Sequence, residues 1–174
     1  ARDEDGVLWV GTGVGVARLI DGALVPLDLA PVDGAEYALG FYEDRALDAM
    51  WIATDRGLAR YSRRDGRMGA IGREQGLPFD KLFAIVADHS GALWLSGNRG
   101  VLRLDRLQAE EVMAGQRERL EVERFTEADG MASAQCNGGS GPPALRRSDG
   151  SLWVATALGV AHVAPERLDD VAEQ

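Results

Sequence analysis

The sequence predicts an all-β protein, a fragment of a β-propeller with about three and a half four-stranded blades. Three observations lead to this prediction. A tryptophan-centred segment occurs four times, its first three copies are 42 and 43 residues apart, and a glycine stands at a fixed position in every copy. Strand-rich repeats of about 40–50 residues are typical of propeller blades.

The four copies of the repeat agree at about six positions, which excludes chance. An apolar residue stands on each side of the tryptophan, a glycine follows six positions later, and an aliphatic residue follows the glycine. The tryptophans are Trp9, Trp51, Trp94 and Trp153, and the glycines are Gly15, Gly57, Gly100 and Gly159.

Each copy is predicted to form a β-hairpin. Its two apolar runs are joined by a short turn that ends in glycine, as a left-handed turn position requires. Consecutive apolar residues, such as Leu8, Trp9 and Val10, indicate strands that are covered on both faces. A sheet packed between two neighbouring sheets has this property. We therefore expect the tryptophans to pack between blades.

Two further strands complete each predicted blade. The sequence then starts at the second strand of one blade and ends after the third strand of another, with about fourteen strands. We expect a piece of a larger propeller, because a propeller needs at least four blades. Strands are predicted before the later hairpins at 38–42, 83–87 and 143–146, and after the hairpins at 23–27, 68–72 and 120–125.

Two short helices interrupt or follow the strands. The interval from Trp94 to Trp153 is 59 residues, and the extra residues near 106–118 suit a short helix on a loop. A second helix is expected at the C-terminal end, with Pro165 in its first turn.

Composition excludes several classes of function. Hydrophobic residues are 45% and charged residues 27% of the 174, which is typical of a soluble globular protein, and no apolar run reaches membrane-spanning length. A net charge of −9 argues against a nucleic-acid partner. The single Cys136 excludes an intrachain disulfide and a multi-cysteine zinc site. The glycine-rich 11–15 segment is a hairpin turn with no following helix, so we predict no phosphate site there. We also predict no bound metal and no cofactor.

The repeat resembles a known family. DHSGALWLSGNRGVLRLD (Asp88–Asp105), preceded by REQGLPFDKLFAI (Arg73–Ile85), resembles the two-component regulator propeller repeat. The segment Arg124–Leu168 is similar to the last stretch of such propellers, which precedes an Ig-like domain and the membrane span. The resemblance covers nearly the whole chain. Two departures, Asp48 in place of a glycine and Ser96-Gly97 in place of Gly-Thr, weaken individual turns.

The resemblance implies a sensor. In this family the propellers are extracytoplasmic sensor regions of bacterial inner-membrane proteins with histidine-kinase, hybrid-kinase or diguanylate-cyclase output domains. It implies a periplasmic, non-catalytic segment that senses a carbohydrate or another small molecule, with the rest of the propeller in the full-length chain as its neighbour. No kinase histidine box and no GGDEF-like loop occurs in the 174 residues.

Other functions stay open as alternatives. Propeller lyases with a similar repeat use a histidine base, and His89 and His162 are the only histidines. His162 takes a strand position that arginine fills in the other copies, and His89 falls in a turn on the face opposite the expected ligand site, which disfavours catalysis. A quinoprotein-like enzyme lacks counterparts for its calcium ligands. The third alternative is a free-standing glycan-binding or scaffold propeller.

The candidate ligand site is the upper rim. There the hairpin turns and the connections between blades, including 77–81 and 129–143, are predicted to lie on one face. The turn residues vary while the framework around them is constant, which is where specificity usually resides. Planar hydrogen-bond donors there suit a polar or carboxylated ligand, although a solvated rim is the simpler alternative. The candidates are Asp55, Arg56, Asn98, Arg99, Asn137 and Ser140.

An open fragment also predicts self-association. Its first and last blades would expose faces lined by Val, Leu and Trp, together with unpaired strand edges. Such patches rarely persist on soluble monomers, so we expect two chains to associate through their terminal blades into a nearly complete ring of about seven or eight blades.

Overall fold

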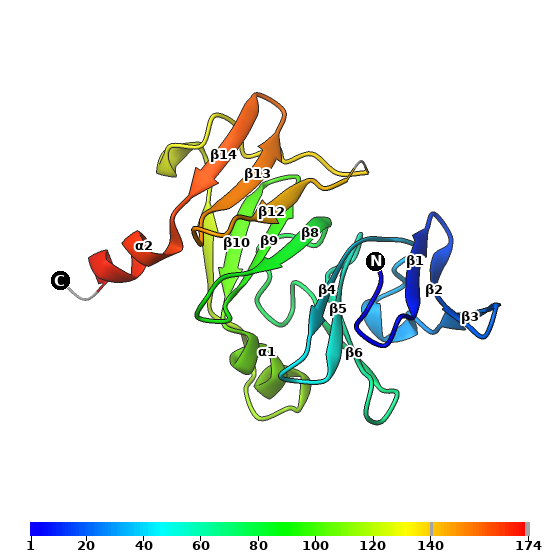
Figure 1. Cartoon of the computed structure of the whole chain (residues 1–174). Coiled ribbons are helices and arrows are strands. Elements are labelled where there is room, and N and C mark those ends of the chain that lie inside the picture. Colours follow the sequence, from blue (N-terminus) through cyan, green and yellow to red (C-terminus); the bar gives the residue numbers. More distant parts are fainter. Residues whose placement is uncertain (140, 173–174) are drawn as a thin grey trace.

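A computed structural model describes residues 1–139 and 141–172, and it contains four antiparallel sheets that follow one another along the chain (Figure 1). We number these sheets as blades 1 to 4. Blade 1 contains β1 (Leu8–Thr12), β2 (Gly15–Ile20) and β3 (Ala23–Leu27). Blade 2 contains β4 (Ala38–Asp44), β5 (Ala49–Thr54), β6 (Leu58–Ser62) and β7 (Met68–Ile71). Blade 3 contains β8 (Leu82–Ala87), β9 (Leu93–Gly97), β10 (Gly100–Leu104) and β11 (Val122–Phe125). Blade 4 contains β12 (Ala144–Arg146), β13 (Leu152–Thr156) and β14 (Gly159–Val163).

In every blade the strands are hydrogen-bonded in chain order, as in a propeller. Blades 2 and 3 have four strands each, blade 1 lacks a full first strand, and blade 4 lacks a fourth strand among the described residues. In blade 1, the N-terminal amine of Ala1 donates to the carbonyl of Trp9, and the Trp9 amide donates to the carbonyl of Ala1. Ala1 and Arg2 thus occupy the position of the first strand. The predicted all-β propeller fragment of three and a half blades is confirmed.

The core lies between the blades, in three apolar clusters. In each cluster a tryptophan of one blade packs against the next blade: Trp9 against blade 2, Trp51 against blade 3 and Trp94 against blade 4. These three side chains are at most 2% exposed. A buried indole removes a large apolar area from water, which makes the tryptophans the centre of each interface between blades.

The fourth tryptophan departs from the expectation of a buried core residue. Trp153 is only half-buried, because its side of blade 4 faces away from the other blades. Leu145 and Val160, on the same side of blade 4, are 42% and 57% exposed. The repeat therefore places Trp153 correctly within its hairpin, but no following sheet covers it in the described chain.

The repeated glycine packs tightly against the fourth strand in blades 2 and 3, whereas an added Cβ at Gly15 of blade 1 meets no atom within 4 Å. Gly57 and Gly100 have φ values of +137° and +130°, and an added Cβ would lie 2.4 Å from the carbonyl oxygens of Ile71 and Phe125. Asp48, which replaces another glycine of the repeat, adopts φ +49°, a left-handed conformation that Asp tolerates better than most residues.

Two helices and two 3₁₀ turns complete the fold. Helix α1 (Arg106–Met113) lies in the predicted insertion but ends before residue 118, and its start is capped by Asp105, whose Oδ1 accepts from the amide of Leu107 at 2.6 Å. Helix α2 (Pro165–Ala172) follows blade 4, and the turns are η1 (Ala30–Val32) and η2 (Glu127–Asp129). Within residues 1–139 and 141–172, no helix has the length and apolar character needed to span a membrane.

Candidate functional site

The strand order divides the loops between two ends of the blades. We call upper face the end with the turns β5–β6, β9–β10 and β13–β14 and the connections between blades, and lower face the opposite end. Hydrogen bonds join turns and connections on the upper face: the Asp55 amide donates to the carbonyl of Tyr37 at 3.3 Å, and the Asn137 amide donates to the carbonyl of Ala155 at 2.9 Å. The predicted grouping of these loops on one face is thus present.

Asp55 anchors a loop. Its Oδ1 accepts hydrogen bonds from the amides of Glu36 and Tyr37, at 3.0 and 3.2 Å, so it ties the connection from blade 1 to the turn of blade 2. Its side chain is 11% exposed. Because two backbone donors already occupy this carboxylate, its contribution to a site is to hold the loop that surrounds Arg56.

Arg56 is the exposed member of the same turn. Its Nε lies 4.0 Å from Oδ2 of Asp55, and its side chain is 55% exposed. It lines a cavity of about 420 Å³ between η1 and the β7–β8 connection. A guanidinium beside a polar cavity can bind a carboxylate or vicinal hydroxyl groups with two parallel hydrogen bonds. The other polar residues that line this cavity are Asp33, Arg73, Glu74, Gln75 and Asp80.

Asn98 and Arg99 form the exposed β9–β10 turn of blade 3. The turn is held from below by Arg124, whose Nε and Nη2 donate to the carbonyl oxygen of Arg99 at 3.1 and 2.8 Å. The Arg124 guanidinium also lies 5.8 Å above the ring of Phe79. These contacts fix the backbone of the turn, while the Asn98 and Arg99 side chains are exposed to solvent.

Asn137 lies beside this turn on the long β11–β12 connection. The neighbouring Cys136 amide donates to the carbonyl of Gly97 at 3.1 Å, and the Asn137 side-chain amide donates to the carbonyl of Thr156 at 3.2 Å. The structure thus brings the segment that contains Asn137 against the β9–β10 hairpin through Cys136, while Asn137 itself bonds to blade 4. Asp55 and Arg56 form a separate group on blade 2. Ser140, the remaining candidate, lies outside the described residues.

Cys136, the only cysteine of the sequence, lies beneath the β9–β10 turn. Cys136 is 3% exposed, and its Sγ lies 3.6 Å from the carbonyl oxygen of Gly100. Burial raises the pKa of the Cys136 thiol above its ordinary value. A buried, protonated thiol is a weak nucleophile, so Cys136 is a packing residue of the connection.

The histidines lie away from the upper face. His89 is in the β8–β9 turn on the lower face, and its Nδ1 is 3.9 Å from Oε1 of Glu166. His162 lies opposite Trp153 in the blade 4 hairpin, with ring centroids 5.0 Å apart. Within residues 1–139 and 141–172, no group of three or more His, Cys, Asp or Glu side chains is arranged to hold a metal ion.

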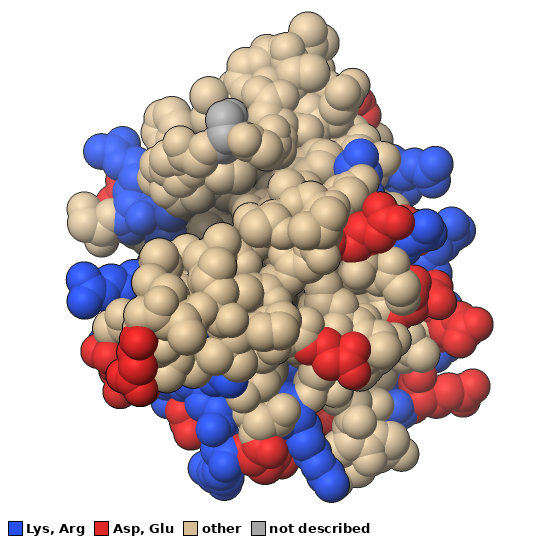
Figure 2. Space-filling model, turned by 90° about the vertical axis from the view of Figure 1, so that its right-hand side faces the viewer, with Lys and Arg blue, Asp and Glu red and all other residues tan. Residues whose placement is uncertain are grey.

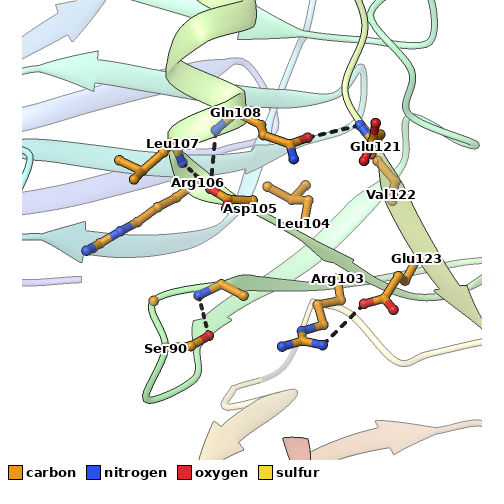
Figure 3. Close-up of a pocket in the computed structure, with 12 residues that line it drawn as sticks. Ser90, Arg103, Leu104, Asp105, Arg106, Leu107, Gln108, Glu121, Val122 and Glu123 are labelled. Carbon is orange, nitrogen blue, oxygen red and sulfur yellow. Dashed lines mark hydrogen bonds and ion pairs between the residues drawn. The ribbon is translucent and has the colours of Figure 1, made fainter. Parts of the chain in front are cut away.

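The lower face carries a cavity that the sequence did not point to. It has about 540 Å³ and lies between the β8–β9 turn, the start of α1 and the start of β11 (Figure 3). Arg103 projects into it, with Nη1 3.4 Å from Oε2 of Glu123. Close by, burial raises the pKa of Asp88, but hydrogen bonds from Ser90, Trp94 and Ala92 outweigh it and hold this pKa below its ordinary value.

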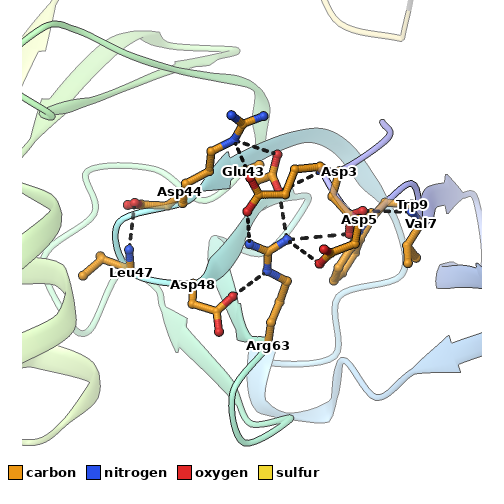
Figure 4. A network of polar contacts seen from close by, with 11 residues as sticks. Asp3, Asp5, Val7, Trp9, Glu43, Asp44, Leu47, Asp48 and Arg63 are labelled. Carbon is orange, nitrogen blue, oxygen red and sulfur yellow. Dashed lines mark hydrogen bonds and ion pairs between the residues drawn. The ribbon is translucent and has the colours of Figure 1, made fainter.

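A second feature of the lower face is a network of charges between blades 1 and 2 (Figure 4). Arg63, with a side chain only 12% exposed, binds Glu43 through Nη1 at 2.8 Å and Asp48 through Nε at 2.8 Å. Its Nη2 lies 3.2 Å from Glu4, and its Nη1 lies 3.5 Å from Asp5. The arginine is saturated by carboxylates, which suits a role in joining the blades.

Comparison with known proteins supports the fold. No family model and no curated protein matches this sequence. Among solved structures, the chain is similar to the extracellular domain of BT3049 from B. thetaiotaomicron, assigned to a hybrid two-component system, with a TM-score of 0.78 and 21% identity. The extracellular domain of BT4673 from the same organism, with the same assignment, gives a TM-score of 0.72 at 16% identity. Virginiamycin B lyase from Staphylococcus aureus gives a TM-score of 0.60 at 15% identity.

The matches span much less of the other proteins than of this one. They cover 99%, 92% and 94% of this chain, but 22% and 20% of the two extracellular domains and 53% of the lyase. The chain therefore spans about a fifth of the length of the first two structures. At these identities the likeness shows the shared fold, and the predicted resemblance to propeller regions of two-component systems is confirmed at that level.

Proposed function

We propose that this chain is a ligand-sensing segment of an extracytoplasmic propeller in a bacterial membrane-bound signalling protein of the two-component or cyclic-di-GMP type. The observation that carries the proposal is the likeness, over 99% of the chain, to an extracellular domain assigned to a hybrid two-component system. The segment has no catalytic role in this proposal, and it lies in the periplasm, with an output domain elsewhere in the full-length protein.

The ligand site in this proposal is the upper face. Arg56 and Arg99 are exposed there on turns whose backbones are held by other residues, so a ligand does not have to order the turns that carry them. Guanidinium groups favour carboxylates, and amides such as Asn98 and Asn137 favour hydroxyl groups. A carbohydrate with a carboxylate, such as a uronic acid or its oligomer, combines both kinds of group.

The lyase fold is the rival from a different class. An enzyme of that kind needs a histidine within hydrogen-bond reach of its substrate and a partner that orients it. Here His89 lies on the lower face and 3.9 Å from its carboxylate partner, and His162 packs edge-on against Trp153. Neither histidine lies among the loops of the upper face, which favours sensing over catalysis.

The ligand is tested by thermal unfolding of the chain with a panel of neutral sugars, uronic acids and their oligomers. We expect a uronic acid oligomer to raise the melting temperature, and Arg99→Ala to remove that increase. Lys81→Ala, on another upper-face connection, serves as a charge-matched control. A panel that leaves the melting temperature unchanged contradicts carbohydrate sensing by this segment.

The signalling context is tested independently by the gene that encodes the chain. We expect it to continue into an Ig-like domain, a membrane helix and a kinase or cyclase domain. A stop codon shortly after the codon for Gln174 contradicts the signalling role and favours a free-standing propeller.

A further inference from the structure

The cavity beside Arg56, which we call the upper cavity, is enclosed by three separate segments of the upper face. Its lining comes from η1 between blades 1 and 2, from the β5–β6 turn and from the β7–β8 connection. All three segments belong to blade 2 or lead into and out of it. The volume of about 420 Å³ lies within the usual range of about 300–1,000 Å³ for small-molecule sites, so the upper cavity is large enough for a small polar ligand.

The wall formed by η1 is held in place by a hydrogen bond and by the core. The Val32 amide donates to the carbonyl of Leu29 at 2.8 Å, and both side chains are buried in the cluster around Trp9. Pro31 and Asp33 flank Val32 in the sequence, are exposed, and line the cavity. This wall therefore offers an apolar ring and a carboxylate to a ligand.

The opposite wall is a hydrogen-bonded turn at residues 72–75. The Gly72 amide donates to Oε1 of Gln75 at 2.9 Å, and the carbonyl of Gln75 accepts from the amide of Leu120 at 2.7 Å. An added Cβ at Gly72 would lie 3.9 Å from the carbonyl oxygen of Arg56, so this wall adjoins the β5–β6 turn. A ligand therefore meets Arg73 on a backbone that is already ordered.

The charged side chains around the upper cavity are unpaired. Within residues 1–139 and 141–172, the Arg73 side chain has no hydrogen bond or ion pair, and the Arg56 side chain has only the 4.0 Å contact with Asp55. A ligand can engage such groups without displacing a protein partner. The lining also includes three carboxylates that have no partner among the same residues, those of Asp33, Glu74 and Asp80.

Arginines of the lower face differ, because protein carboxylates already neutralise their charge. Arg63 binds Glu43 and Asp48 at 2.8 Å each (Figure 4). Arg106 Nη1 lies 3.0 Å from both carboxylate oxygens of Asp44. The carboxylate of a ligand would have to replace these partners. The unpaired guanidinium groups of the upper cavity are therefore the better anchors for an anionic ligand.

The distribution of charge limits the ligand to a single carboxylate. On the side of the molecule in Figure 2, acidic and basic side chains both border a broad uncharged area, so an extended polyanion finds no continuous basic surface there. Inside the upper cavity the three carboxylates repel a second negative charge, but they accept hydrogen bonds from hydroxyl groups. The lining thus suits a unit with one carboxylate and several hydroxyl groups, which is a hexuronic acid.

Within the proposed sensing function, on which this inference rests, we propose that the upper cavity binds the terminal unit of a uronic acid chain. The carboxylate of that unit lies between Arg56 and Arg73, and the remaining units extend over the upper face to Arg99 on blade 3. Arg73 is thus a binding residue in addition to the candidates that the sequence indicates. The hydroxyl groups of the terminal unit donate to the carboxylates of Asp33, Glu74 and Asp80.

Titration of the ¹⁵N-labelled chain, followed by NMR, measures the dissociation constants of three ligands. They are a hexuronic acid monomer, its trimer and the methyl ester of the monomer. The ester keeps the hydroxyl groups and loses the charge. We therefore expect the ester to bind the wild type at least about tenfold more weakly than the monomer does.

Two substitutions separate the upper cavity from the rest of the upper face. Arg73→Gln should weaken binding of both the monomer and the trimer at least about tenfold, because it removes a charged partner of the carboxylate. Arg99→Ala should weaken binding of the trimer alone, since the monomer does not reach blade 3. Arg64→Gln is the matched control, because Arg64 is an exposed arginine in the β6–β7 turn at the opposite end of blade 2.

The outcomes distinguish a failure of the upper cavity from a failure of the proposed function. Trimer binding that Arg99→Ala weakens and Arg73→Gln leaves unchanged overturns the inference, while sensing by the upper face stands. A methyl ester that binds as tightly as the monomer also overturns the inference, because the carboxylate is then not recognised. If neither the monomer nor the trimer shifts any amide signal of the wild type, carbohydrate sensing by this segment fails, and the inference fails with it.

Discussion

The indole Nε1 of Trp94 donates a hydrogen bond of 2.8 Å to Oδ2 of Asp88, six residues earlier in the chain. The same bond joins Trp9 to Asp3 at 2.8 Å and Trp51 to Asp44 at 3.3 Å. Asp44 is the last residue of β4, Asp88 directly follows β8, and Asp3 takes the equivalent place in blade 1. Each aspartate satisfies a buried donor that the interface between blades would otherwise leave without a partner. In its first three copies the repeat is therefore a tryptophan–aspartate repeat, in which the carboxylate permits burial of the indole, whereas Trp153 donates to Oγ of Ser151 at 3.1 Å.

Loss of this carboxylate should destabilise the blade. Asp88 also accepts hydrogen bonds from the amides of Ser90 and Ala92, so Asp88→Ala leaves several buried donors unpaired. We expect the free energy of unfolding to fall by about 1–3 kcal/mol, measured by urea denaturation. Asp88→Asn, which keeps an acceptor oxygen, should lower the free energy of unfolding by less. Equal losses in the two variants would contradict the hydrogen-bond account.

The same carboxylate predicts a dependence on pH. The pKa of Asp88 in the folded chain lies below its ordinary value of 3.8, so its contribution to stability is complete above the pKa of the unfolded state. That contribution is lost as the pH falls through the lowered pKa of the folded state. We expect the difference in unfolding free energy between wild type and Asp88→Asn to shrink below about pH 4. Urea denaturation at a series of pH values from neutral to acidic measures this difference. A difference that stays constant down to pH 2 would argue against a stabilising role of the ionised Asp88 carboxylate.

The repeated glycine predicts unequal effects of one substitution at two sites. Gly100→Ala introduces a Cβ 2.4 Å from the carbonyl oxygen of Phe125, in addition to the unfavourable φ of +130°. Gly159 has φ +125° but no atom within 4 Å of an added Cβ, so Gly159→Ala carries the backbone term alone, about 1–3 kcal/mol. Thermal unfolding should show a clearly larger loss for Gly100→Ala. Similar losses of stability in the two variants would mean that β11 shifts to accommodate the added Cβ at little cost in free energy.

Arg63 should stabilise the interface between blades 1 and 2 through charge. Arg63→Met removes the cation that lies among Glu4, Glu43 and Asp48, and leaves these carboxylates to repel one another. We expect a loss of about 2–4 kcal/mol at low salt that becomes smaller at high salt, because salt screens the repulsion. The neighbouring Arg64 is exposed, and Arg64→Met is the control. A salt-independent loss would indicate that packing, not charge, is the origin.

The sequence predicts the blades well because each hairpin repeats its own local signals. The apolar run around Trp51 and the glycine at Gly57 act within one hairpin, and β3 matches its predicted range of 23–27. The exposure of Trp153 could not be predicted from its hairpin, because burial depends on whether another sheet covers that side. The ion pair between Arg106 and Asp44 joins residues 62 positions apart and has no local signal, although the recurrence of aspartate before each of the first three tryptophans could have indicated the Asp–Trp bond.

The candidate site is predictable only in part. The turns around Arg56 and Arg99 follow from the repeat, because strand order determines which loops share a face. The two backbone amides that occupy Asp55, and the contact that brings Asn137 beside the β9–β10 turn, depend on connections whose conformation the repeat does not specify. The structure thus shows that Asp55 anchors its loop through Oδ1, which the sequence did not indicate, and its contact with a ligand stays a prediction.

The most direct test of the account is a map of ligand binding by NMR of the ¹⁵N-labelled chain, titrated with uronic acid oligomers. We predict that the amide signals of Arg56, Asn98, Arg99 and Asn137 shift with a common saturation curve, while the signals of Ser90, Asp105 and Glu123 around the lower cavity remain in place. Shifts confined to the lower cavity, or shifts at neither face, would contradict the assignment of the upper face as the sensing surface.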